Sequence, residues 1–250
     1  MRKFGLIGYP LGHSFSKKYF SEKFIKEQIT DCSYENYPLT DIDQFRKLIT
    51  SDPEVLGLNV TIPYKSEIIK YIDIMDPEAS EIGAVNVLKI KRFGKKIKIH
   101  GFNSDVTGIR DTLIPYISDS VNNALVLGTG GGSLAVCFVL KSFGIKVVSV
   151  SRKHKPGIIS YEEIDNELLK RQDLIVNTTP LGMYPDIESR PDINYSMLSG
   201  KHILFDLVYN PELTSFLKSG KERGCTVISG IKMLWSQAER SWEIWNDDKY

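Results

Sequence analysis

Residues 123–140 read NALVLGTGGGSLAVCFVL: a short apolar run, a turn with four glycines, and a second apolar run long enough to begin a helix. Glycines between a strand and a helix let a phosphate approach the backbone, and the helix N-terminus supplies free N–H groups and partial positive charge. The stretch therefore predicts a pyrophosphate site on Gly128, Gly130, Gly131 and Gly132. Ser133 stands where the common dinucleotide fingerprint has its third glycine, so a glycine turn without a ligand remains the alternative.

The next apolar run, 146–150, ends in Ser151, Arg152 and Lys153. Sites for NAD usually place an acid near this strand end, whereas a guanidinium suits the 2′-phosphate of NADP by charge and by its fork geometry. Arg152, with Lys153 beside it, therefore favours NADP, and a solvated basic turn is the alternative. The interval from Arg152 to the next strand has room for one helix, at about 161–171.

Working outward, short apolar runs rich in β-branched residues alternate with segments of helical period, which is typical of an α/β fold. The runs predict strands at 4–8, 34–38, 55–60, 86–90, 97–101, 124–127, 146–150, 173–177, 203–207 and 226–228. Helical periods occupy 15–25 and 42–49, and a final helix is expected from about 231 to 245. Residues 92–95 predict a hairpin, so the first sheet should include one antiparallel pair.

A chain of 250 residues is long enough for two domains. We expect an N-terminal open α/β substrate domain with a mostly parallel sheet at 1–104, and a Rossmann-like NADP-binding domain at 105–230. The helix that begins near 231 follows the last predicted strand. Its expected place is back against the first domain, which residues 231–250 would complete.

Composition limits the partners. Lys+Arg 32 against Asp+Glu 31 gives no broad field for nucleic acid or an anionic membrane. The three cysteines are scattered, the four histidines form no spaced ligand set, and we expect no disulfide and no metal. The N-terminal apolar run is too short for a signal peptide, and no later run is long enough to span a bilayer. We expect a cytoplasmic protein with a small-molecule partner, present as a monomer or homodimer.

Polar residues gather in four clusters at predicted strand ends, at 8–16, 59–65, 83–86 and 101–108. In an open α/β sheet, ligands bind beyond the carboxyl ends of the strands. The hydroxyls, amides, one lysine and one aspartate of these clusters would therefore suit a small anionic ligand rich in hydroxyl groups.

Together with 177–183, 206–214 and 230–238, these clusters closely resemble the shikimate dehydrogenase family, in the same order and spacing from Gly8 to Ala238. The resemblance implies reversible reduction of 3-dehydroshikimate to shikimate with NADPH, a step of aromatic amino acid and chorismate biosynthesis. It implies that Lys65 and Asp105 form the catalytic pair and also touch substrate. The implied substrate-binding residues are Ser14, Ser16, Asn59, Thr61, Lys65, Asn86, Asp105, Tyr209 and Gln237. The implied cofactor-binding residues are Gly128, Thr129, Gly130, Gly131, Gly132, Ser151, Arg152, Lys153, Thr178, Leu207 and Gly230.

The sequence departs from the family pattern around the cofactor. Ser151 replaces the usual Asn, Lys153 replaces the usual Thr, and the segment after them is short. These departures leave two alternatives open: a quinate/shikimate dehydrogenase with relaxed substrate or NAD use, and a catalytically silent protein that binds NADP or shikimate on the same scaffold. The presence of both Lys65 and Asp105 argues against the silent protein.

The chemistry of ketone reduction assigns the two charged residues their roles. A hydride goes to carbon and a proton to oxygen, so the protein must supply a proton donor. We expect Lys65 to pass that proton, and Asp105 to hold the ammonium and a substrate hydroxyl. Some of the polar residues have plain structural alternatives: one of Ser14 and Ser16 would cap the helix that follows, Asn86 could be a turn residue, and 61–63 a simple helix start.

Overall fold

The structure is a computed structural model that describes residues 1–11 and 15–249. The chain divides into two compact units. Unit 1 comprises Met1–Ser104 and Ala238–Tyr250, and unit 2 comprises Asp105–Gln237. The second division lies inside the last helix, α8 (Ile231–Asn246), so this one helix belongs to both units.

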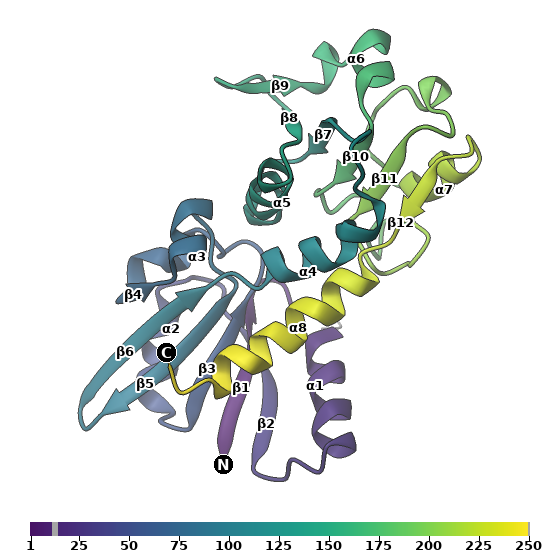
Figure 1. The fold of residues 1–250 in the computed structure, drawn as a ribbon. Helices are drawn as coiled ribbons and strands as arrows, with labels where there is room; N and C mark the ends of the chain where they lie inside the picture. The colour runs from purple at the N-terminus through teal and green to yellow at the C-terminus, as the bar shows by residue number, and fades with distance from the viewer. Residues whose placement is uncertain (12–14, 250) are drawn as a thin grey trace. The chain divides into compact units, whose positions relative to one another are not determined.

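Unit 1 contains a six-stranded sheet in the order β2-β1-β3-β5-β6-β4 (Figure 1). Its strands are β1 (Arg2–Gly8), β2 (Cys32–Pro38), β3 (Val55–Val60), β4 (Ile74–Met75), β5 (Val87–Phe93) and β6 (Lys96–Phe102). β1 pairs in parallel with β2 and β3, β4 pairs in parallel with β6, and β5 runs antiparallel to both β3 and β6. The sheet is mostly parallel, and the predicted hairpin at 92–95 is confirmed.

Side chains from alternate positions of each strand form two cores, one on each face of this sheet. Ile7, Leu58 and Ile90 lie in the first core, with Phe45 of α2 (Gln44–Ser51). Further elements of unit 1 are η1 (Glu67–Tyr71) and α3 (Pro77–Ile82). The second core joins Phe4 of β1 to α1 (Phe15–Lys26) and to the C-terminal half of α8. The predicted return of the last helix to the first sheet is therefore seen within unit 1.

Trp245 fixes α8 on the sheet. Its ring stacks on Phe4 with centroids 4.7 Å apart, and its Nε1 donates to the Leu88 carbonyl at 3.0 Å. Gly57 of β3 makes this contact possible, because a Cβ on Gly57 would lie 2.5 Å from the indole.

We expect Gly57→Ala to lower the free energy of unfolding by about 1–3 kcal/mol, because the added methyl group overpacks the core against Trp245. Urea denaturation followed by tryptophan fluorescence measures the loss. Gly94→Ala is the control. Gly94 lies in the exposed hairpin turn with a positive φ, and nothing would lie within 4 Å of its added methyl group. This variant therefore measures the cost of the positive φ without any overpacking. A Gly57→Ala protein as stable as the wild type would contradict the packing described.

The hairpin of β5 and β6 carries a crowded row of positive charge. Lys91 lies directly opposite Lys98, and burial together with Lys91, Lys89 and Lys98 lowers the pKa of His100. β4 covers β6 only at His100 and Gly101, so residues 96–98 border an open edge of the sheet. Lysines along such an edge discourage pairing with other chains.

Unit 2 contains a second six-stranded sheet, in the order β12-β11-β10-β7-β8-β9, and every pairing in it is parallel. The strands are β7 (Asn123–Leu127), β8 (Lys146–Ser151), β9 (Ile158–Ser160), β10 (Leu174–Asn177), β11 (Ile203–Asp206) and β12 (Thr226–Ile228). The helices are α4 (Asp105–Leu113), α5 (Gly131–Ser142), α6 (Asn166–Arg171) and α7 (Ser215–Lys221), with short 3-10 turns η2 (Ile114–Tyr116), η3 (Tyr161–Glu163) and η4 (Tyr195–Met197). This strand order is that of a Rossmann fold, whose switch point lies between β7 and β10.

The segment after Arg152 differs from the prediction of one helix at 161–171. It forms β9, then the turn η3, and only then α6, which starts after Asp165 accepts a hydrogen bond from Leu168 N at 2.6 Å. The apolar pair at 158–159 is too short to predict a strand alone, and pairing with β8 makes it one. The two-residue strand β4 was missed for the same reason.

Candidate functional site

In unit 1, β3 and β5 run in opposite directions, so the end of β3 lies beside the start of β5. Predicted substrate residues at these two strand ends therefore lie at the same end of the sheet. Asn59 lies near the end of β3 and Asn86 directly before β5, which runs the other way. The Val60 N–H donates to the Asn86 carbonyl at 2.8 Å, and the Asn86 N–H donates to the Phe102 carbonyl at 3.0 Å. The polar clusters 59–65 and 83–86 therefore lie together, beside residues 101–104 of the cluster 101–108.

Asn59 and Asn86 belong to a buried polar network. Asn59 Nδ2 donates to Ser241 Oγ at 2.9 Å and to the Asn86 carbonyl at 3.3 Å, and Asn86 Oδ1 accepts from the Ser104 N–H at 2.7 Å. The hydroxyls of Ser104 and Ser241 lie 3.2 Å apart, and both residues are fully buried. Ser104 and Ser241 hold both asparagine amides in fixed orientations. Neither serine was predicted to have a role.

Lys65 lies in the turn between β3 and η1, and its side chain is half-buried. Its carbonyl accepts from the Val85 N–H at 2.7 Å, which fixes the turn next to Asn86. Thr61 stands at the start of this turn, where its N–H donates to the Ile7 carbonyl at 2.9 Å. Ser16 lies in the first turn of α1, and Ser14 lies outside the described residues.

Three of the predicted substrate-site residues belong to unit 2. Asp105 is the first residue of α4 and is 3% exposed. Tyr209 follows β11, and burial raises its pKa. Gln237 lies in α8, where its Nε2 donates to the Leu234 carbonyl at 3.1 Å. That these residues meet Lys65 stays a prediction.

The glycine turn of unit 2 connects the end of β7 to the start of α5. Gly128 has φ of +112°, which favours glycine, and a Cβ there would lie 2.5 Å from Thr178 Oγ1. A Cβ on Gly130 would meet nothing within 4 Å, and no side chain caps the N-terminus of α5. The space in front of the turn and the N–H groups of the first turn of α5 are thus open to a phosphate group.

The other predicted cofactor residues line the same carboxyl edge of the sheet. Thr178 Oγ1 donates to the Leu127 carbonyl at 2.7 Å, beside Gly128. Leu207 lies against Gly132, whose Cβ would be 3.2 Å from Leu207 Cδ2, and against Gly230, whose Cβ would be 2.4 Å from the Leu207 carbonyl. Residues far apart in sequence therefore gather around the switch point of the sheet.

Ser151, one departure from the family pattern, shapes the turn that presents Arg152. Its hydroxyl donates to the Lys153 carbonyl and accepts from the Lys153 N–H at 3.3 Å. Ser151 is 8% exposed, whereas Arg152 and Lys153 are exposed. No ion pair within the described residues engages the Arg152 guanidinium, so it is available to an anionic ligand.

The carboxyl group of Asp206 is buried behind this end of the sheet. No role was predicted for it from the sequence. Asp206 Oδ1 accepts from Asn177 Nδ2 at 2.9 Å and from the Val208 N–H at 3.0 Å, and Oδ2 accepts from Thr214 Oγ1 at 2.6 Å. Burial raises the pKa of Asp206 to about 7, although the three hydrogen-bond donors act to lower it. Asn177 also accepts from Thr179, so the network joins the loops that carry Thr178 and Leu207. Asn177 and Asp206 are each the polar last residue of an apolar strand. This pattern is the signal in the sequence that could have identified them.

Within residues 1–11 and 15–249, the structure has no cluster of His, Cys, Asp or Glu that could hold a metal ion. In the same part of the chain, no helix is both long and apolar enough to cross a membrane.

The parallel sheet with its glycine turn at the switch point defines unit 2 as a dinucleotide-binding domain of the Rossmann class. Comparison with known proteins gives the family. The family described as "Shikimate dehydrogenase substrate binding domain" matches residues 6–88. The curated "Shikimate dehydrogenase (NADP(+))" of Clostridium beijerinckii is 37% identical over 99% of this chain and 93% of its own length. The chain belongs to the shikimate dehydrogenase family.

Solved structures agree with this assignment. Shikimate dehydrogenase 1 from Peptoclostridium difficile has a TM-score of 0.83 and 36% identity, over 100% of this chain and 94% of its own. The shikimate 5-dehydrogenase from Thermus thermophilus, solved with NADP(H) and shikimate, has a TM-score of 0.85 and 28% identity over 98% of this chain and 94% of its own.

Proposed function

We propose that this chain is an NADP-dependent oxidoreductase that reversibly reduces 3-dehydroshikimate to shikimate. The observation that carries the proposal is the similarity to curated NADP-dependent shikimate dehydrogenases over nearly the whole chain. The open glycine turn and the exposed Arg152 support the cofactor, and the polar edge of unit 1 supports a substrate rich in hydroxyl groups.

Bound NADPH would supply the hydride that goes to the substrate's carbonyl carbon. The backbone of Gly128 to Gly132 would hold its pyrophosphate, and Arg152 with Lys153 would hold its 2′-phosphate. Thr129, Ser151, Thr178, Leu207 and Gly230 would complete the wall around it.

The proposed substrate contacts come from residues whose side chains carry hydroxyl or amide groups. They are Ser14, Ser16, Asn59, Thr61, Asn86, Tyr209 and Gln237. Because the orientation of Asn59 and Asn86 is fixed by buried partners, their amides would meet the substrate without first losing rotamer freedom.

In the proposed chemistry, the Lys65 ammonium donates a proton to the carbonyl oxygen as the hydride arrives at carbon. The Asp105 carboxylate accepts a hydrogen bond from the ammonium and another from a substrate hydroxyl, which orients both. In the reverse direction, Lys65 accepts the proton of the shikimate hydroxyl that is oxidised.

The test is an initial-rate assay that follows nicotinamide absorbance, with shikimate or quinate as substrate and with NADP or NAD as cofactor. We expect turnover with shikimate and NADP to exceed the other three combinations. Equal rates with quinate or NAD would replace the proposal by the relaxed quinate/shikimate enzyme, and no turnover with any pair would replace it by a silent binding protein.

Arg152→Ala should raise KM for NADP by roughly 10–100-fold, because a charge-assisted contact to a phosphate contributes about 1.5–3 kcal/mol. KM for NAD should change little, since NAD has no 2′-phosphate. Arg171→Ala, at the end of α6, is a matched control that removes another surface guanidinium of unit 2. Equal losses with the two cofactors would show that Arg152 does not read the 2′-phosphate.

The cytoplasmic location and the monomeric or homodimeric state remain predictions. Cell fractionation would test the first, and size-exclusion chromatography with light scattering would test the second.

A further inference from the structure

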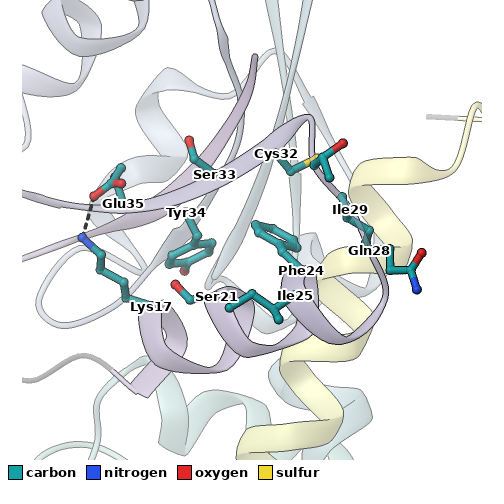
Figure 2. Close-up of a pocket in the computed structure, with 11 residues that line it drawn as sticks. Lys17, Ser21, Phe24, Ile25, Gln28, Ile29, Cys32, Ser33, Tyr34 and Glu35 are labelled. Carbon is teal, nitrogen blue, oxygen red and sulfur yellow. Dashed lines mark hydrogen bonds and ion pairs between the residues drawn. The ribbon is translucent and has the colours of Figure 1, made fainter.

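Tyr34 is a buried tyrosine of β2 that lies between the sheet and helix α1, where an open groove runs along the two elements (Figure 2). It is 3% exposed, and its ring stacks on Phe20 of α1 with centroids 4.5 Å apart. Its hydroxyl donates to Asn59 Oδ1 at 2.8 Å. Tyr34 therefore holds a polar group inside the second core of unit 1, where an unpaired hydroxyl would be costly.

Ser16 of α1 lies on the same side of the helix as the ring that stacks on Tyr34. Phe20 stands four residues after Ser16 on α1, so the two side chains share one face of the helix. The Phe20–Tyr34 stack thus fixes the helix face on which Ser16 lies. Burial raises the pKa of Tyr34, and the nearby Ser16 side chain opposes that shift.

Tyr34 holds the oxygen end of the Asn59 amide. The Asn59 oxygen accepts the phenol proton, and the amide nitrogen donates to the Asn86 carbonyl and to Ser241 Oγ. A phenylalanine at position 34 would remove the only donor to the amide oxygen among these contacts and would leave the amide held by its nitrogen end alone. The Tyr34 hydroxyl therefore restricts how the Asn59 side chain can move at the end of β3.

We propose that Tyr34 is a positioning residue, whose hydroxyl holds the Asn59 amide in the orientation in which it binds substrate. The inference rests on the proposed function, because it takes Asn59 as a substrate contact. Tyr34 itself is buried and acts through the Asn59 side chain.

The test is Tyr34→Phe, which removes one oxygen atom and keeps the stacked ring. We expect KM for shikimate to rise roughly tenfold, which corresponds to about 1.4 kcal/mol for one hydrogen bond. KM for NADP should stay the same, and kcat should change less than KM. Tyr37→Phe, the same deletion on the same strand, is the control and should leave all three constants unchanged.

A double-mutant cycle separates positioning from a purely structural role. If Tyr34 acts through Asn59, Asn59→Ala should already raise KM for shikimate, and adding Tyr34→Phe should raise it by much less than tenfold. Thermal melting of each variant measures stability independently. A Tyr34→Phe protein with a lower Tm and an unchanged KM would overturn the proposal, and so would fully multiplicative effects in the double variant.

The wild-type measurement separates the positioning role of Tyr34 from the proposed function of the protein. Wild-type turnover of shikimate with NADP, combined with an unchanged KM in Tyr34→Phe, would reject the positioning role and leave the proposed function intact. A wild type that turns over no shikimate would reject both.

Discussion

Lys65→Met should lower kcat by roughly 10²–10⁴-fold, the range expected when a positioned proton donor is removed. Methionine keeps a side chain of similar length and fits a half-buried position, so unit 1 should remain folded. Water would then have to supply the proton without being held in place. The fall should appear in kcat more than in KM, and steady-state rates with shikimate and NADP measure both.

Lys70→Met is the matched control, because Lys70 is an exposed lysine of the adjacent η1 whose Nζ bonds Asp43 at 2.8 Å. Its removal should leave kcat within about twofold, as expected when one exposed ion pair is lost. A Lys65→Met enzyme with kcat close to that of the wild type would remove Lys65 from the proton route. The proposed chemistry would then need another donor.

Asp206→Ala should lower the free energy of unfolding by about 3–5 kcal/mol at pH 5, because three buried donors lose their acceptor. The loss should depend on pH in a defined direction. The pKa of Asp206 is raised from 3.8 to about 7 on folding, so this carboxyl group binds a proton on folding between those values. Its contribution to stability is therefore full at low pH and declines as pH rises toward 7. Urea denaturation of both proteins at pH 5 and pH 8 measures the difference.

Asp186→Ala, at an exposed position of unit 2, is the control and should change stability by less than about 0.5 kcal/mol. If the difference in unfolding free energy between wild type and Asp206→Ala were the same at pH 5 and pH 8, the carboxyl group would be ionised at both pH values in the folded protein. The raised pKa, and with it the burial that causes it, would then be wrong. Activity assays on the same protein would also report whether the loops that carry Thr178 and Leu207 need this network.

The elements that the sequence predicted well are those specified by local pattern. The strands at 55–60 and 226–228 appear with the predicted bounds, because their apolar runs end at polar or turn residues. The segment 158–171 was predicted poorly, since β9 exists only through its pairing with β8. Of the candidate site, the sequence predicted the place of the glycine turn between a strand and a helix, and Arg152 at the end of the next strand. It predicted no role for Asp206, Ser104 and Tyr34.

Each of the missed residues has at least one hydrogen-bond partner that is distant in sequence. Asn59 and Ser241 are separated by 182 positions, and Asn177 and Asp206 by 29. No periodicity or spacing rule connects positions so far apart. Their contacts depend on strand register and on how α1 and α8 pack on the sheet.

The amino-acid sequence by itself determined the class of both sheets, the position of the glycine turn and the family, because each follows from local periodicity or from motifs of fixed spacing. Only the tertiary structure decided which polar side chains are buried together and which way they face. The physical reason is that a hydrogen bond requires two atoms within about 3 Å, and a register slip of one residue turns every side chain of a strand to the opposite face.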